Sequence, residues 1–254
     1  LVYPKESILS VSSGGTVESV ESITMEDLKA FYEKSFSPSV ARMHVVGKIG
    51  KDRVMNGMES LSANWKTFDV DIPEIEAPVV AEKSAIYFVD VPGAKQSVIN
   101  IGHYAIPRSS DEYHPATVMN YKLGGSFNGN VNLVLREEKG FTYGARTGFS
   151  GSHIPGVFKA SASVRSSATE ESVAIFKDLM EQYREGITDE DLAFTKDALI
   201  KSNAREFETL RALISMLEGI SMYNLPADYV VGEEEIVRNM TLDKHKELAQ
   251  KYID

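Results

Sequence analysis

Two segments near opposite ends of the chain share one pattern, and this repeat constrains the fold more than any other feature. Residues 15–36 (GTVESVESITMEDLKAFYEKSF) match residues 232–253 (GEEEIVRNMTLDKHKELAQKYI) without a gap. Each copy predicts a short acidic turn or helix, a Thr N-cap (Thr24, Thr241) and an amphipathic helix. In the first copy Thr24 and Asp27 have the spacing of a capping box. We interpret the repeat as two homologous domains in tandem, because about 217 residues separate the copies, which is too long for a solenoid unit. The alternative is a chance resemblance between two capped helices.

The two copies continue differently, and this difference predicts the domain organisation. After the first copy, residues 42–47 form an apolar run that predicts a buried strand. The second copy is followed only by Asp254, and little sequence precedes the first copy. We therefore expect residues 1–68 to be the C-terminal part of a first domain. Residues 69–84, with two prolines and many acids, are the expected linker, and 85–254 would be a second domain without its last strand.

The remaining pattern predicts an α+β fold with helices packed on one face of a sheet. Alternation at 157–164 predicts a strand with one buried face, on which Phe158, Ala160, Ala162 and Val164 lie. Helical spacing of Val173, Phe176, Met180 and Tyr183 predicts a packed helix at 169–183. Further predicted elements are strands at 85–91 and 96–104 joined by a turn at 92–93, and helices at 51–65, 112–123, 131–138 and 188–223.

Composition excludes several classes of function. A net charge of −10 argues against a nucleic-acid-binding surface, which needs a basic face. The chain has no cysteine, so disulfides and thiolate metal sites are excluded. No stretch reaches the roughly 18 apolar residues that a membrane span requires.

Histidine spacing gives no local metal site. No histidine has a second one three to five residues away, as a zinc-binding helix would require. We interpret the histidines at 44 and 103 as structural strand residues, those at 114 and 245 as parts of solvated helix faces, and that at 153 as a loop residue.

One short stretch offers a candidate site. Arg136 lies on the last turn of the predicted helix 131–138, Gly140 ends that helix, and Tyr143 begins the next extended segment. A tight reversal there would bring a guanidinium and a phenol to one edge, where they could bind a peptide carbonyl and a developing oxyanion. The alternative is that Arg136 pairs with Glu137 and that Tyr143 is a half-buried strand residue.

Residues 135–145 (LREEKGFTYGA) closely resemble a signature of the M16 family of zinc metallopeptidases, which includes pitrilysin, insulin-degrading enzyme and mitochondrial processing peptidase. Three more segments carry the resemblance, namely 106–113 (IPRSSDEY), 123–127 (LGGSF) and 14–49, so that it covers nearly the whole chain. It departs from the family at 129–131, where Gly-Asn-Val replaces Ser-Arg-Leu and a basic contact is lost.

The resemblance implies a LuxS/metallopeptidase-like α+β fold built from pairs of homologous domains. It also implies that this chain is the non-zinc half. The zinc-binding segment would precede residue 1, so that the chain alone would hold no metal and would be inactive, while the intact peptidase would hold zinc. Arg136 and Tyr143 would hold the substrate backbone and stabilise the tetrahedral intermediate opposite a zinc-bearing domain in the same chain or in a partner subunit. Family substrates are unstructured peptides, held as an added strand on a sheet edge.

Two further expectations follow from the resemblance. The parent could be a non-catalytic M16 homologue that serves as a binding or structural partner of an active subunit, and the presence of an H-x-x-E-H motif upstream would distinguish the two. Many bacterial relatives are exported, so the resemblance favours the bacterial periplasm.

Overall fold

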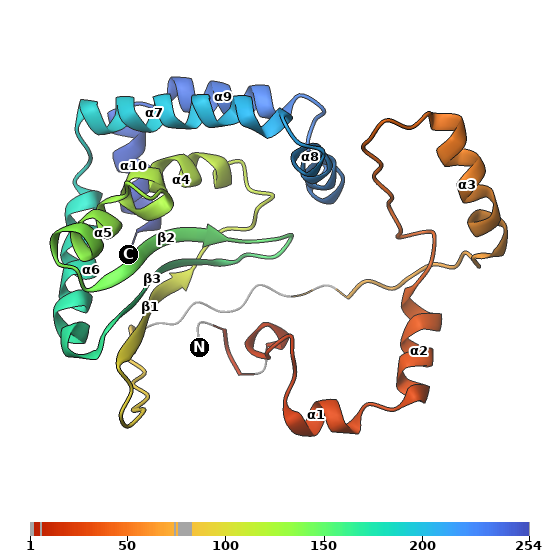
Figure 1. Cartoon of the computed structure of the whole chain (residues 1–254), viewed down its shortest axis with the longest axis horizontal. Coiled ribbons are helices and arrows are strands. Elements are labelled where there is room, and N and C mark those ends of the chain that lie inside the picture. The colour runs from red at the N-terminus through yellow and green to blue at the C-terminus, as the bar shows by residue number, and fades with distance from the viewer. Residues whose placement is uncertain (1–2, 6, 74, 76–82, 254) are drawn as a thin grey trace. The chain divides into compact units, whose positions relative to one another are not determined.

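The computed structural model describes residues 3–5, 7–73, 75 and 83–253, and its contacts divide the chain into two units (Figure 1). The sheet unit comprises residues 77–204 and 228–254, and the helical unit comprises residues 3–76 and 205–227. The expected linker at 69–84 stays a prediction, because much of that segment lies outside the described residues. No helix in the described part of the chain is both long and apolar enough to cross a membrane.

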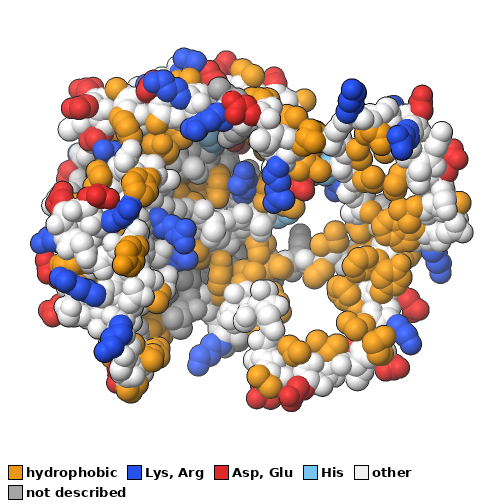
Figure 2. Space-filling view, viewed as in Figure 1, with side chains coloured by type: hydrophobic (Ala, Val, Ile, Leu, Met, Phe, Trp, Pro, Cys, Tyr) orange, Lys and Arg blue, Asp and Glu red, His pale blue; other side chains and the backbone are white. Residues whose placement is uncertain are grey.

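The helices of the helical unit contain no buried residue among those described. The main helices of this unit are α1 (Val17–Ser22), α2 (Met25–Ser35), α3 (Lys51–Asn64) and α8 (Leu210–Tyr223). Of these, α1, α2 and α8 begin at a Thr side-chain cap. The predicted capping box at the start of α2 is confirmed, since Asp27 N donates to Thr24 Oγ1 and Thr24 N donates to the Asp27 carboxylate. Ser37 joins the segments that follow α2 and α3, because its hydroxyl donates to Phe68 O and accepts from Phe68 N. Figure 2 shows hydrophobic side chains gathered over α2 and α3.

Two predicted strands are absent. Residues 42–47 and 85–91 pair with no strand among the described residues, and most of their apolar side chains are exposed, with Met43 at 60% and Ile86 at 97%. A strand needs a neighbour that accepts and donates its backbone hydrogen bonds. An apolar run alone cannot supply one, so the prediction is wrong for both segments.

The sheet unit is built on three antiparallel strands in the order β1–β3–β2. These are β1 (Gln96–Tyr104), β2 (Thr142–Ser150) and β3 (Val157–Arg165). The turn before β1 is confirmed at Pro92-Gly93, where Gly93 has φ 80°. The alternation along β3 is also confirmed, because Phe158, Ala160 and Val164 are fully buried.

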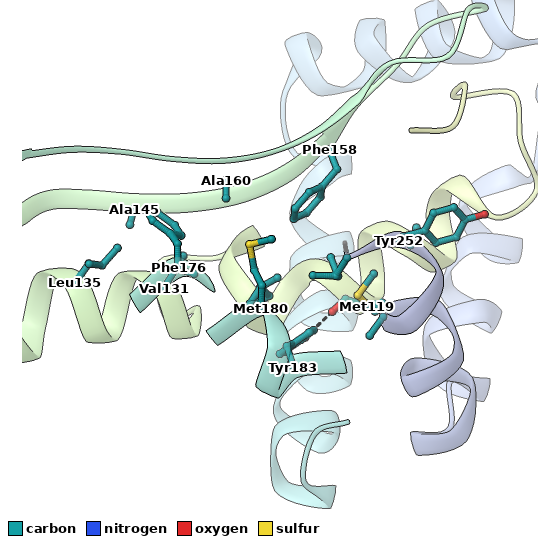
Figure 3. Close-up of a cluster of buried hydrophobic side chains, with 14 of the residues drawn as sticks. Met119, Val131, Leu135, Ala145, Phe158, Ala160, Phe176, Met180, Tyr183 and Tyr252 are labelled. Carbon is teal, nitrogen blue, oxygen red and sulfur yellow. Dashed lines mark hydrogen bonds between the residues drawn. The ribbon is translucent and has the colours of Figure 1, made fainter. Parts of the chain in front are cut away.

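Helices cover one face of this sheet, so the α+β class with helices on one face is confirmed. Figure 3 shows Ala145, Phe158 and Ala160 pointing from the strands into a core formed with Met119, Leu135, Phe176 and Met180. The helices around this core are α4 (Tyr113–Asn120), η2 (Tyr121–Gly125), α5 (Asn130–Asn132), η3 (Leu133–Glu138), α6 (Thr169–Arg184), α7 (Asp189–Asn203), α9 (Tyr229–Asn239) and α10 (Leu242–Tyr252). Short 3₁₀ turns are η1 (Ile8–Ser10), η4 (Ser166–Ala168) and η5 (Ala204–Phe207).

Two helix predictions need correction. On α6, Phe176, Met180 and Tyr183 are buried as expected, but Val173 is 42% exposed. The predicted long helix at 188–223 is divided into α7, η5 and α8, although Thr188 caps its start as expected. The division occurs because Thr209 has extended backbone angles and its hydroxyl accepts from Ala212 N, which begins a new helix.

The two copies of the sequence repeat have the same local structure from the Thr N-cap to the end of the second helix. In each copy a helix (α1 or α9) is followed by a Thr N-cap and a second helix (α2 or α10). Thr24 has φ −102° and ψ 166°, and Thr241 has φ −110° and ψ 163°. The residues that end the second helices also agree, with Phe36 at φ −97°, ψ 93° and Ile253 at φ −111°, ψ 99°. The copies therefore share one backbone path from the Thr N-cap onward, whereas Gly15 (φ 70°) and the extended residue that follows it precede α1 at positions that match residues inside α9.

Candidate functional site

The helix that carries Arg136 ends in a glycine turn, as the sequence predicts. η3 is a stretch of wide π-type helix, and its end is closed by Gly140 N donating to Arg136 O (3.1 Å) and Phe141 N donating to Leu135 O (2.9 Å). Gly140 has φ 62°, a left-handed angle that other residues rarely adopt. The chain reverses there and enters β2, so Arg136 and Tyr143 lie on the two sides of one turn.

A β-bulge directs Tyr143 away from the core. Thr142 pairs with Val164 and Ala145 pairs with Ala162, so two residues of β2 lie opposite one residue of β3. In a regular strand Tyr143 would share the buried face of Ala145, two positions on. The extra residue shifts that alternation, and Tyr143 is 92% exposed. The Thr142 hydroxyl fixes the bulge by donating to Ser163 O (2.7 Å) and accepting from Gly144 N (3.1 Å).

Arg136 is held against an aromatic ring. Its guanidinium carbon lies 4.5 Å from the centroid of the Phe127 ring, a cation–π contact. Nε lies 3.5 Å from a carboxylate oxygen of Glu137, so the ion pair considered in the sequence analysis is present. Nη1, however, is buried and has no hydrogen-bond partner among the described residues. The Arg136 side chain as a whole is 33% exposed, so the donors that a ligand could reach are those other than the buried Nη1.

A buried asparagine, which sequence reasoning missed, joins the parts of the site. Asn132 is 3% exposed, its Nδ2 donates to Phe127 O (2.7 Å), and its Oδ1 accepts from Ala145 N (3.0 Å). One side chain thus connects the helix of Arg136, the loop beneath it and the strand of Tyr143. The only feature of the sequence that could have indicated this role is an asparagine among the apolar residues of the predicted helix.

Arg136 and Tyr143 line the same open concavity, of about 500 Å³. Its other lining residues are Gln96, Glu137, Gly140, Phe141, Thr142 and Arg165. Gln96 and Arg165 are paired across β1 and β3, and the Arg165 guanidinium lies 4.8 Å from the centroid of the Phe141 ring. Sequence reasoning missed both residues, because it does not give the register between strands.

The outer edge of β2 is already bonded near the site. Besides the bond from Ala145 N to Asn132, Asn120 Nδ2 donates to Thr147 O (3.0 Å), and Thr147 Oγ1 donates to Asn120 Oδ1 (2.6 Å). A peptide could not add as a strand at these positions without displacing two buried asparagine amides.

The histidines are placed differently from the sequence interpretation. His103 is structural as expected, with its ring nitrogens 2.9 Å from Tyr104 O and 3.1 Å from Tyr252 O. His44 lies outside any strand. His114 is half-buried, 3.4 Å from Glu233. His245, expected on a solvated face, is 1% exposed. Within residues 3–5, 7–73, 75 and 83–253, no three His, Asp or Glu side chains gather where they could hold a metal ion.

Burial of His245 places it in a hydrogen-bonded cluster under α4. Its Nε2 lies 3.0 Å from the Tyr183 hydroxyl and 3.2 Å from Met119 O, and the Tyr183 hydroxyl donates to Met119 O (2.6 Å; Figure 3). Burial lowers the pKa of His245 to about 4 and raises that of Tyr183. These groups belong to the core and lie outside the concavity.

Comparisons with known proteins agree on a family. Residues 22–199 match the family model described as "Peptidase M16 inactive domain". The chain is 23% identical over 208 residues to a Streptomyces coelicolor protein named "Uncharacterized zinc protease". It is 24% identical over 195 residues to the "Probable inactive metalloprotease YmfF" of Bacillus subtilis. These alignments cover 80% and 76% of the chain but 45% and 44% of the relatives, so the chain spans less than half of their length.

A solved structure supports the fold. The crystal structure of a peptidase M16 inactive domain from Pseudomonas fluorescens superposes with a TM-score of 0.85 and 24% sequence identity. The superposition covers 96% of this chain and 58% of that chain. At this level of identity the similarity establishes the fold alone.

Proposed function

The chain belongs to the family of peptidase M16 inactive domains, and we propose that it is the non-zinc half of an M16 zinc metallopeptidase. In this role it closes the substrate chamber and holds an extended peptide for hydrolysis by a zinc-bearing domain outside this sequence. The observation that carries the proposal is the meeting of Arg136 and Tyr143 at one open concavity beside the sheet. In this proposal the role of the chain is to bind and orient the peptide, while the zinc ligands lie outside this sequence.

The two side chains suit different parts of that task. Arg136 is anchored by Phe127 and its side chain is 33% exposed at the concavity, so the guanidinium N–H groups that face solvent can donate hydrogen bonds to a peptide carbonyl. Tyr143 is exposed, and its hydroxyl can donate to an oxygen that gains negative charge as the peptide bond is attacked. The bulge and the Asn132 bonds fix the backbone beneath them, and such preorganisation favours catalysis over mere binding.

The same proposal assigns residues 1–68 to the end of a preceding homologous domain, and α8 (Leu210–Tyr223) to the second domain. Burial of the repeat supports this assignment. In the second copy Leu248 and Ile253 are fully buried, while their counterparts Phe31 and Phe36 in the first copy are 62% and 49% exposed. The second helices thus share a backbone path but differ in burial, which supports the proposal that the first copy is completed by a layer like the one that covers the second.

Hydrolysis assays test the roles of Arg136 and Tyr143. The sample is this chain joined with its zinc-bearing M16 domain, in one polypeptide or as a partner subunit, and the substrate is an internally quenched peptide. Tyr143→Phe removes only the hydroxyl and should lower kcat about 100-fold, the usual effect of losing one oxyanion donor. Arg136→Lys keeps the charge but loses the fork of donors, and should raise KM.

Tyr87→Phe is the matched control, because Tyr87 is also exposed (63%) but does not line the concavity. Wild-type kcat/KM in both site variants would refute the proposed roles. A stoichiometric, chelator-sensitive zinc ion bound to the 254-residue chain alone would refute its assignment as the non-zinc half.

A second candidate is a non-catalytic homologue that serves as a partner subunit. The name of the Bacillus subtilis relative favours it. An H-x-x-E-H motif encoded in the parent protein supports the peptidase, and its absence there supports the partner subunit.

A further inference from the structure

The face of the sheet opposite the helices is open and carries only positive charges. The exposed residues form cross-strand rows, in which Gln96 lies beside Arg165, Val98 beside Ser163, Asn100 beside Ser161 and Arg146, and Gly102 beside Lys159 and Gly148. The three strands together contain Arg146, Lys159 and Arg165 but no aspartate or glutamate. This composition contrasts with the whole chain, which has 37 acidic and 27 basic residues.

These cations are not neutralised within the described part of the chain. Arg146, Lys159 and Arg165 form no ion pair with a described carboxylate, although most other described cations in the sheet unit's helices do. Arg146 lies opposite Ser161, two residues from Lys159 on β3. Diagonal neighbours of this kind are about 7–8 Å apart, and like charges that close repel one another. An anionic ligand would offset that repulsion.

The charged face continues from the concavity. Arg165 belongs to both, since it lines the concavity and lies on the open face. Lys159 is six residues from Arg165 along β3, which corresponds to roughly 20 Å of extended chain. Serines at 161 and 163, both without bulky side chains, lie between them. An extended peptide that leaves the concavity along β3 would pass over Ser163 and Ser161 and reach Arg146 and Lys159.

We propose that this open face selects acidic peptides, with Arg146 and Lys159 pairing with aspartate or glutamate side chains of a substrate held at Arg136 and Tyr143. The inference rests on the proposed function and adds a substrate class to it. A peptide with a few carboxylates could place one opposite each of the separate cations of this face. A nucleic acid carries charge at every residue and would be repelled by a chain of net charge −10.

The test compares two peptides and two charge-matched variants of the full 254-residue chain. The probes are a fluorescein-labelled extended peptide rich in Asp and Glu and its counterpart with Asn and Gln, and fluorescence anisotropy gives Kd. Arg146→Gln with Lys159→Gln removes the two cations of the open face. Lys177→Gln with Lys201→Gln is the control, because it removes two exposed helix cations that pair with Glu181 and Asp197.

We expect the chain to bind the acidic peptide more tightly than the neutral one. Each exposed ion pair changes affinity about 1.4- to 5-fold, so the double variant of the open face should bind the acidic peptide about 2- to 30-fold more weakly. Its affinity for the neutral peptide and the affinities of the control variant should be unchanged. The preference for the acidic peptide should also diminish in about 1 M salt, where the screening length is about 3 Å.

The other outcomes separate the two proposals. Equal affinity for both peptides, lost in Arg136 and Tyr143 variants, overturns the acidic preference and leaves the proposed function standing. An equal loss in the control variant overturns the assignment to this face. Tighter binding of a single-stranded DNA oligonucleotide that depends on Arg146 and Lys159 overturns the peptide as ligand. Failure to bind either peptide overturns peptide binding by this chain, and with it both proposals.

Discussion

Protonation of His245 should destabilise the sheet unit at mildly acidic pH. The ring is buried, its Nε2 faces Met119 O and the Tyr183 hydroxyl, and its Nδ1 has no partner among the described residues. Met119 O can only accept, so we assign the proton of the neutral ring to Nε2. Protonation then adds an N–H at Nδ1 in a place where nothing described accepts it, which costs free energy.

The magnitude follows from linkage. The pKa of His245 is about 4 in the folded chain, against 6.5 for the free side chain. Because the folded state binds the proton less readily, this contribution to stability is present above pH 6.5 and is lost as the pH falls toward 4. The loss is about 2 kcal/mol at about pH 5 and about 3 kcal/mol at about pH 4, from 1.36 kcal/mol per pKa unit. The carboxylate of Asp191 raises the pKa of His245, so Asp191 should remain unsubstituted in both proteins that are compared.

The assay compares urea unfolding of the wild type and of His245→Gln between about pH 7.5 and 4.5. Far-UV circular dichroism is the appropriate signal, because the single tryptophan, Trp65, lies in the helical unit. The glutamine does not titrate, so the wild type should lose about 2 kcal/mol more than the variant on going to about pH 5. An NMR titration of His245 near its free value of 6.5, or parallel stability curves for the two proteins, would refute the reasoning.

Three further predictions concern packing and capping, each measured as the free energy of unfolding. Phe158→Ala should cost about 3–5 kcal/mol, because the side chain is fully buried and contacts the Phe149 ring. Gly124→Ala should cost about 1–3 kcal/mol, because a Cβ there would lie 2.6 Å from the backbone nitrogen of Thr147. Thr241→Ala should cost about 1 kcal/mol, because it removes the acceptor for Lys244 N at the start of α10.

Each of these predictions has a matched control. Val98→Ala changes an exposed residue (71%) of the same sheet and should have little effect beside Phe158→Ala. Gly57→Ala lies in α3 with no atom within 4 Å of the added Cβ, and should stabilise that helix by about 0.5–1 kcal/mol. Thr241→Ser keeps a capping hydroxyl and should be nearly neutral. If a substitution lowers the free energy of unfolding no more than its control does, the contact proposed for that residue does not contribute to stability.

Features set by neighbouring residues could be predicted from the sequence. The Thr24 and Thr241 caps are confirmed because a cap depends on a side chain and an amide three residues away. The buried face of β3 is confirmed because strand geometry sends alternate side chains to opposite faces. The turn at Gly140 is confirmed because few residues other than glycine adopt its positive φ.

Features that depend on residues distant in the chain could not be predicted from the sequence. The apolar runs at 42–47 and 85–91 fit the strand pattern, but pairing requires a neighbour that the sequence pattern does not name. His245 has charged neighbours along the chain, yet α10 turns it toward Met119 and Tyr183, more than 60 residues away. The periodicity of a helix indicates which residues share a face but not which face meets the core.

The candidate site divides in the same way. Sequence by itself determined the reversal between Arg136 and Tyr143, because the glycine turn joins residues only seven positions apart. Only the tertiary structure decided that both line one concavity with Gln96 and Arg165, since strand register and a β-bulge set where those side chains point. Register and bulges result from pairing between segments far apart in the chain. Which residues pair is decided only when the whole core packs.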